Sequence, residues 1–195
     1  TPTRRQRQMC IRDSFKMIKK YLFLIIMFGL FSMGSKTYAE IAYNFKFNGI
    51  DGKQINLADY ENKVLVVVNV ASRCGFTPQY SDLQKVWEDY KDKNVIIIGV
   101  PTNNFKQEPG SNKEIKDFCE TNFNINFPMT EKIDVLGKNA HPFFKWAREN
   151  YGNSAIPKWN FHKIIVGKDG KVANTFSSIT KPSSEKFRKA IEKLI

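Results

Sequence analysis

The chain has 195 residues, of which 42% are hydrophobic and 13% aromatic, a composition that excludes an intrinsically disordered protein and allows one ordinary folded domain. Its formal net charge of +12 is concentrated in residues 1–39, where eight basic residues accompany one acidic residue. The rest of the chain keeps 23 basic and 18 acidic residues, which are interleaved and give no support to nucleic-acid binding.

Residues 1–39 fall into two parts. Residues 1–16 stand ahead of a complete signal peptide, so we interpret them as a non-native leader and exclude them, with Cys10, from the fold. Residues 17–39 have a positive start, an apolar run over 21–31 and a small-residue cleavage site at their end. The run has about half of the ~20 residues that a spanning helix needs, which favours export with cleavage over a membrane anchor. We therefore expect a periplasmic or extracellular protein without stable membrane insertion.

The folded domain is expected over residues 40–195, and it opens with a β-hairpin whose polar and apolar residues alternate around a Gly-x-Asp-Gly turn. Unbroken β-branched runs predict buried strands over 63–70 and 94–100, separated by an amphipathic helix over 78–92. The later predicted elements are a helix over 112–123, a helix over 142–150, a hairpin over 161–177 and a closing helix over 182–194.

This order of elements is that of the thioredoxin fold, an α/β architecture with, here, an N-terminal β-hairpin and a central mixed sheet flanked by helices. The active position of that fold is the junction between a central strand and the helix after it, where Cys74 lies. A thioredoxin would carry Cys-x-x-Cys at this junction, whereas this chain reads Cys-Gly-Phe-Thr.

The stretch NVASRCGFTPQY (69–80) surrounds Cys74 with features that suit a reactive thiol. Small residues let the chain turn sharply after the strand, and Thr77 followed by Pro78 is a helix-start signal in which the threonine can cap the orphan amides. The backbone N–H groups of a helix N-terminus favour a thiolate, and Arg73 adds a positive charge beside it. Cys119 is the second cysteine of the expected domain, and cysteine counting alone leaves a structural disulfide open.

Three segments together resemble the active-site signatures of the glutathione peroxidase family: NVASRCGFTPQY (69–80), QEPGS (107–111) and KWNFHKIIV (158–166). The resemblance extends over about residues 45–194. It implies a peroxidase that reduces hydrogen peroxide and organic or lipid hydroperoxides through a sulfenic acid on a nucleophilic cysteine, with no metal or organic cofactor. The residues that it places at the site are Cys74 as the nucleophile and Gln107, Trp159 and Asn160 as its hydrogen-bonding companions.

Each companion taken alone has a commoner role: Trp159 as core filling, Gln107 as a solvated loop residue and Asn160 as a turn former. Only the joint pattern favours a site. The chain also departs from the family pattern before Gln107, because the segment ending in Lys106 is one residue shorter and lacks a glycine. The two histidines of the domain, His141 and His162, have no metal-ligand spacing.

The segment IKDFCETNF (115–123) resembles the part of two-cysteine, thioredoxin-using family members that holds the resolving cysteine. The resemblance implies that Cys119 attacks the Cys74 sulfenic acid and that a thioredoxin-like reductant, or glutathione, recycles the enzyme. Because Cys119 is predicted within a helix, closing the disulfide would require local unwinding. The stretch between Trp146 and Trp159 is short, as in monomeric members of the family.

Two other functions remain open from the sequence. One is a glutathione-dependent peroxidase in which Cys119 takes no part. The other is a non-catalytic redox-sensing or binding module that keeps the fold and holds a structural disulfide between Cys74 and Cys119.

Overall fold

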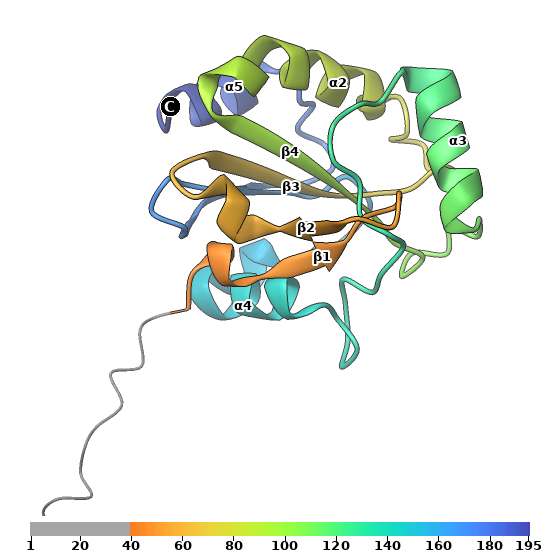
Figure 1. The fold of residues 1–195 in the computed structure, drawn as a ribbon, viewed down its shortest axis with the longest axis horizontal. Helices are drawn as coiled ribbons and strands as arrows, with labels where there is room; N and C mark the ends of the chain where they lie inside the picture. The colour runs from red at the N-terminus through yellow and green to blue at the C-terminus, as the bar shows by residue number, and fades with distance from the viewer. Residues whose placement is uncertain (1–39) are drawn as a thin grey trace, which may run out of the picture. The chain divides into compact units, whose positions relative to one another are not determined.

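The computed structural model describes residues 40–195, whose core is a four-stranded mixed sheet in the order β4-β3-β5-β6 (Figure 1). β3 runs parallel to β4 and antiparallel to β5, and β6 runs antiparallel to β5. A separate two-stranded sheet joins β1 and β2, which form the predicted N-terminal hairpin. The bounds of the six strands are β1 Lys46–Asn48, β2 Gln54–Asn56, β3 Val64–Val70, β4 Val95–Pro101, β5 Lys163–Val166 and β6 Val172–Phe176.

Four α-helices between residues 40 and 195 surround the sheet, each within a few residues of its predicted range. They are α2 Gln79–Tyr90, α3 Asn112–Phe123, α4 Pro142–Tyr151 and α5 Glu185–Glu192. Short 3-10 helices lie at Ala42–Asn44, Leu57–Tyr60, Lys91–Lys93 and Gly152–Ala155. The α/β thioredoxin fold with an N-terminal hairpin is therefore confirmed.

Alternate residues of the fully buried β3 face two hydrophobic cores, as expected for a central strand covered on both sides. Val66 and Val68 belong to the core that α2, α3 and α5 complete, and Cys74 and Cys119 belong to the same core. Leu65 belongs to the core shared with α4 and the N-terminal hairpin. Figure 1 shows α2 and α5 on one side of the sheet and α4 on the other.

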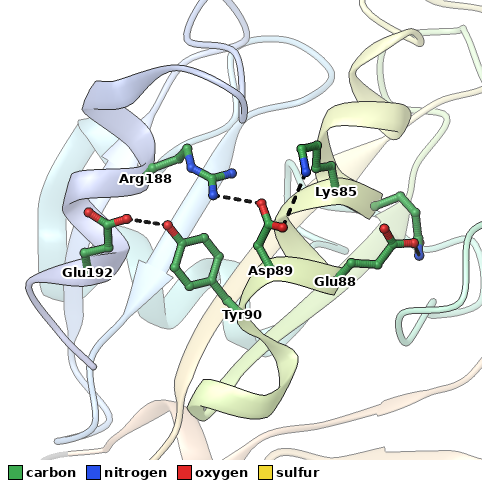
Figure 2. A network of polar contacts seen from close by, with 7 residues as sticks. Lys85, Glu88, Asp89, Tyr90, Arg188 and Glu192 are labelled. Atoms are coloured by element: carbon green, nitrogen blue, oxygen red, sulfur yellow. Dashed lines mark hydrogen bonds and ion pairs between the residues drawn. The ribbon is translucent and has the colours of Figure 1, made fainter.

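Polar contacts hold the C-terminal helix α5 against α2 (Figure 2). Arg188 Nη2 donates to Asp89 Oδ2 at 2.8 Å, and the Arg188 guanidinium lies over the Tyr90 ring, 5.0 Å from its centroid. Tyr90 Oη donates to Glu192 Oε1 at 2.5 Å. The hydrogen bond from Arg188 has the largest effect on the pKa of Asp89 and lowers it; burial opposes this, and Lys85 lowers the pKa further. These contacts fix α5 beside the helix that starts at the Cys74 loop.

Within residues 40–195, no helix combines the length and the apolar character needed to cross a membrane. The predicted leader (1–16) and signal peptide (17–39) lie outside the described residues, so both stay predictions.

Candidate active site

Cys74 lies in the tight loop between β3 and α2, with 8% of its surface exposed. Its backbone amide donates to Thr77 Oγ1 at 3.0 Å, and that hydroxyl donates to the carbonyl of Ala71 at 2.9 Å. The amide of Phe76 donates to Cys74 Sγ at 3.4 Å. The loop therefore aims a backbone donor at the sulfur, an arrangement that stabilises negative charge on it.

The predicted cap by Thr77 is wrong. Helix α2 begins at Gln79 with Pro78 at the cap position, and no side chain caps it. The Thr77 hydroxyl is instead used inside the loop, between the Cys74 amide and the Ala71 carbonyl. The sequence signal placed the helix start correctly within two residues, but a threonine oxygen can bond to any nearby amide, and here it accepts from the loop amide of Cys74.

Glu108 joins the Cys74 loop to the loop that carries Gln107. Its Oε2 accepts from the backbone amide of Ser72 at 2.7 Å and from the Ser72 hydroxyl at 2.9 Å. The amide of Arg73 also donates to the carbonyl of Gln107 at 3.1 Å. Glu108 is 1% exposed, and this burial raises the pKa of its carboxyl, while the two hydrogen bonds from Ser72 and the charges of Lys132 and Arg73 partly offset the rise.

The structure brings Gln107 and Asn160 together. Asn160 Nδ2 donates to Gln107 Oε1 at 2.8 Å, so the shorter segment before Gln107 still lets it reach Asn160. Lys106, beside Gln107, adopts the left-handed backbone conformation with φ of 57°, a conformation that glycine would reach without strain. Asn160 is fully buried, and its Oδ1 accepts no hydrogen bond from the part of the chain that the structure describes.

Trp159 lies at the surface of the same region; it is 42% exposed, and its ring centroid lies 5.4 Å from that of Phe105. It is therefore not the core residue that a lone tryptophan would most often be. In the part of the chain from 40 to 195, none of Gln107, Trp159 and Asn160 donates a hydrogen bond to Cys74 Sγ. Their role as companions of the reacting sulfur stays a prediction.

Asn69, which is fully buried near the end of β3, holds the segment that carries Trp159 and Asn160. Its Nδ2 donates to the Trp159 carbonyl at 3.1 Å, and its Oδ1 accepts from the amide of His162 at 3.1 Å. Phe161 between them has a φ of 63°, and its amide donates to the Asn69 carbonyl at 2.6 Å. A bulky residue in this conformation is held there by its surroundings, as is common beside functional sites.

The buried amine of Lys163 belongs to a hydrogen-bond network that reaches Asn160. Lys163 Nζ, on the fully buried Lys163 side chain, donates to Gln79 Oε1 at 2.6 Å and to the Thr180 carbonyl at 2.8 Å. Gln79 Nε2 donates in turn to the Ser178 carbonyl at 2.7 Å, and Ser178 Oγ donates to the Asn160 carbonyl at 2.6 Å. Burial lowers the pKa of Lys163 to about 7.

Cys119 lies on the inner face of α3 and is 1% exposed. Burial, first, and the charges of Glu108 and Glu120 raise the pKa of its thiol to about 11, while the nearby Tyr80 hydroxyl acts to lower it. Both Cys74 and Cys119 are free thiols in this structure, so no disulfide joins them here.

The two histidines do not form a metal site. His141 Nδ1 accepts from the Phe143 amide at 3.3 Å, so its Nε2 is the protonated nitrogen and donates to the Lys46 carbonyl at 3.1 Å. His162 is buried, and burial together with the charges of Lys163 and Lys158 lowers its pKa to about 4. The described residues contain no group of three or more His, Cys, Asp or Glu that could hold a metal ion.

Comparisons with known proteins agree on one family. A family model described as glutathione peroxidase matches residues 42–148. Hydroperoxy fatty acid reductase gpx1 of Synechocystis sp. is 44% identical, over 78% of this chain and 95% of that protein. Glutathione peroxidase-like peroxiredoxin 2 of Saccharomyces cerevisiae is 43% identical, over 73% of this chain and 90% of that protein.

Solved structures give the same fold. The apo form of Trgpx superposes with a TM-score of 0.63 at 32% identity, covering 80% of this chain and 96% of that one. A thioredoxin-family thiol:disulfide interchange protein from Chlorobium tepidum has a TM-score of 0.60 at 15% identity, covering 82% of this chain and 99% of that one. At that identity the second likeness concerns the fold alone.

Proposed function

The chain belongs to the glutathione peroxidase family and is a thiol-dependent peroxidase, and we propose that Cys74 is the residue that reduces the hydroperoxide. The observation that carries this assignment is the hydrogen bond from the Phe76 amide to Cys74 Sγ, at the end of a central strand of the sheet. A second observation supports it. Among residues 40–195, Asn160 Oδ1 is a buried acceptor that receives no hydrogen bond, and the O–H group of a hydroperoxide is a donor.

The proposed reaction has three steps. The Cys74 thiolate attacks the distal oxygen of the hydroperoxide, the O–O bond breaks, and the leaving oxygen takes a proton to become water or an alcohol. Cys74 is then a sulfenic acid. The Cys119 thiol displaces its hydroxyl group, which forms the Cys74–Cys119 disulfide and one molecule of water. An external dithiol, or two molecules of glutathione, reduces this disulfide and returns both thiols.

Gln107, Trp159 and Asn160 are proposed as donors to the oxygen that carries negative charge when the O–O bond breaks. Amide and indole N–H groups suit this role because they donate without competing for the proton. In this structure Asn160 Nδ2 donates to Gln107 Oε1, and the side-chain nitrogen of Gln107 takes no part in that bond. The reaction as proposed uses no metal or organic cofactor.

The attack of Cys119 on the Cys74 sulfenic acid requires α3 to open locally. Cys119 lies within the helix, is almost completely buried, and has a thiol whose raised pKa keeps it protonated at neutral pH. A buried protonated thiol is a poor nucleophile. We therefore propose that unwinding of α3 around Cys119 brings it to the sulfenic acid and exposes it to a proton acceptor.

For the reductant, we propose a thioredoxin-like protein as the first candidate and glutathione as the second. The yeast relative is named a peroxiredoxin, and Cys119 lies in a segment similar to the one that holds the resolving cysteine in thioredoxin-using family members. We also propose a monomer, because only a short stretch joins Trp146 to Trp159. Light scattering after gel filtration would test the monomer.

Export remains a separate proposal. The positive start, apolar run and cleavage site of residues 17–39 support secretion to the periplasm or outside the cell, with loss of the leader. Expression of the chain from residue 17 onward, followed by cell fractionation and N-terminal sequencing of the mature protein, tests it. A mature protein that retains residue 17 in the membrane fraction would contradict it.

The experiment that tests the assigned activity is steady-state reduction of hydrogen peroxide by residues 40–195 with thioredoxin and thioredoxin reductase, or with glutathione. Wild type should turn over, and Cys74→Ser should not. Cys119→Ser should lose turnover with thioredoxin but keep turnover with glutathione if Cys119 is the resolving residue. Activity in Cys74→Ser at the wild-type rate would overturn the proposal.

A further inference from the structure

Lys163, the first residue of β5, is a basic residue in the interior of the fold. Its side chain is fully buried, and no carboxylate between residues 40 and 195 forms an ion pair with it. A buried charge without an ion pair costs free energy, and an apolar side chain of similar length would fill the same space at a lower cost. What the amine adds is two directed hydrogen bonds, from its Nζ to Gln79 Oε1 at 2.6 Å and to the Thr180 carbonyl at 2.8 Å.

The hydrogen bond to Gln79 leads to the backbone donor of the reactive sulfur. Gln79 is the first residue of α2, and its backbone amide donates to the Phe76 carbonyl at 2.9 Å. The amide of Phe76 donates in turn to Cys74 Sγ at 3.4 Å. The turn that aims this amide at the sulfur therefore closes on the residue that Lys163 holds.

A second branch runs from Gln79 to Asn160. Gln79 Nε2 donates to the Ser178 carbonyl at 2.7 Å, and Ser178 Oγ donates to the Asn160 carbonyl at 2.6 Å. Gln79 and Ser178 are both buried, so these bonds are shielded from water. Because the Asn160 side chain donates to Gln107, this branch ends at two of the predicted companions of the sulfur.

The hydrogen bond to Thr180 fixes the segment between β6 and α5. Lys163 holds this segment directly at Thr180 and, through Gln79, at Ser178. One buried amine thus joins three parts of the chain, which are the start of β5, the first turn of α2 and the segment after β6. The Cys74 loop leads directly into α2, so the placement of that loop depends on the same amine.

The two hydrogen bonds do not depend on the protonation state of the amine. Burial lowers the pKa of Lys163 to about 7, and the charge of Asp82 acts in the opposite direction. An ammonium group has three N–H donors and a neutral amine has two, whereas the amine has two acceptors to satisfy. Both forms can therefore hold Gln79 and Thr180.

We propose that Lys163 is a positioning residue for the step in which Cys74 reacts with the hydroperoxide. Through the two branches that leave Gln79, it holds the backbone donor to the sulfur and the main chain of Asn160. The inference rests on the proposed function of Cys74. Reduction of the oxidised enzyme by an external thiol does not use these donors, so the positioning role concerns the peroxide step alone.

The test separates the two half-reactions of the purified protein, with hydrogen peroxide as the substrate and thioredoxin as the reductant. Ping-pong kinetics give one kcat/KM for each of the two. Lys163→Met removes both hydrogen bonds and keeps a side chain of similar length. Ser178→Ala removes only the bond to the Asn160 carbonyl. Tyr90→Phe is the matched control, because it removes the hydrogen bond to Glu192 at the opposite end of α2.

Lys163→Met should lower kcat/KM for hydrogen peroxide by about tenfold or more, since small displacements of the groups around a reacting atom have effects of this size. Ser178→Ala should lower it by a smaller factor, and the double variant should fall no further than Lys163→Met, because the two residues act in series. The kcat/KM for thioredoxin should stay within about twofold of wild type in every variant. Tyr90→Phe should leave both constants unchanged.

The ratio of the wild-type to the Lys163→Met constant for hydrogen peroxide should be the same at pH 6 and at pH 8.5. A ratio that falls to one at pH 8.5, where the amine is neutral, would assign the effect to its charge and overturn the positioning role. Equal losses for hydrogen peroxide and thioredoxin would also overturn it. If Lys163→Met does not fold, a wild-type constant for hydrogen peroxide in Ser178→Ala overturns it, whereas a wild type that does not reduce hydrogen peroxide overturns the proposed function instead.

Discussion

Glu108 accepts two hydrogen bonds on one carboxylate oxygen from Ser72, at 2.7 Å from its amide and 2.9 Å from its hydroxyl. Ser72 lies two residues before Cys74, and Glu108 follows Gln107 directly, so this contact sets the position of the thiol against the loop that carries its predicted companion. Glu108 is 1% exposed, and each of these hydrogen bonds is therefore shielded from water.

Replacement of Glu108 by alanine should lower both stability and activity. The buried Ser72 donors would lose their acceptor, which costs about 1–3 kcal/mol in the free energy of unfolding. The Cys74 loop would also lose its fixed distance from Gln107, and we expect the rate constant for hydrogen peroxide to fall about tenfold or more. Urea denaturation and stopped-flow peroxide consumption measure the two effects.

Glu108→Gln is the matched control. It keeps an acceptor for Ser72 and should stay within about 1 kcal/mol of wild type at pH 7. Because burial raises the pKa of Glu108 above its ordinary value of 4.5, the folded protein holds a proton that the unfolded chain releases above that pH. Wild-type stability should therefore fall relative to Glu108→Gln as the pH rises through that region. A Glu108→Ala variant with wild-type stability and rate would contradict the positioning role.

Asn69→Ala should disturb the segment that carries Trp159 and Asn160. The Trp159 carbonyl and the His162 amide would each lose a partner at 3.1 Å, and we expect a loss of about 2 kcal/mol in the free energy of unfolding. The kcat for peroxide should fall while the KM for thioredoxin stays unchanged, since the change lies at the chemical site. Asn174→Ala, at a half-buried position on β6, is the comparison variant. Equal kcat in the two variants would contradict the expectation.

The lowered pKa of Lys163 predicts how the free energy of unfolding depends on pH. Its folded pKa of about 7 lies below the ordinary value of 10.5, so between these values the unfolded chain holds a proton that the folded protein has released. Stability should therefore increase with pH from 7 upward, by at most about 1.4 kcal/mol per pH unit. Well below pH 7 both states hold the proton, so this group should cause no change of stability with pH there.

Urea denaturation at pH 7, 8 and 9 of wild type and of Lys163→Met measures this contribution. The variant lacks the titrating amine, so the difference between wild type and variant should shift in favour of wild type across this range. Parallel pH curves for the two proteins would show that Lys163 keeps its proton in the fold.

Cys119 should resist alkylation in the folded, reduced protein. Burial raises its pKa to about 11, so at pH 8 almost none of it is thiolate. Iodoacetamide at pH 8 should label Cys74 and leave Cys119 unlabelled, as peptide mass spectrometry would show, and both should be labelled in concentrated urea. Equal labelling of the two cysteines without urea would mean that α3 opens freely before any peroxide is bound.

Much of the fold could be predicted from the sequence because its elements have strong local signals. The unbroken β-branched run over 63–70 has the composition of a strand buried on both faces, and Ser111 with Glu114 forms a capping box at the start of α3. Cys74 was predicted at the strand-to-helix junction for the same reason. Resemblance to the family then supplied Gln107, Trp159 and Asn160, which have no local signal of their own.

The residues that hold the site together could not be predicted in this way. Asn69, Glu108 and Lys163 are polar residues whose burial depends on partners far along the chain, such as Ser72 for Glu108 and Thr180 for Lys163. The one available signal was a polar residue inside or beside an apolar run, which Asn69 and Lys163 both show. The Thr77 cap was wrong because its choice of partner depends on the loop geometry, which the sequence does not reveal.

The central claim is that Cys74 reacts with peroxide and Cys119 resolves the product. The most direct test is intact-mass and free-thiol analysis of reduced residues 40–195, before and after one equivalent of hydrogen peroxide, with Cys119→Ser beside wild type. The account predicts that wild type loses both thiols and two hydrogen masses, while Cys119→Ser gains one oxygen on Cys74. Reaction of both proteins only at the rate of a free thiol in solution, or oxygen gained by wild type with no disulfide, would contradict it.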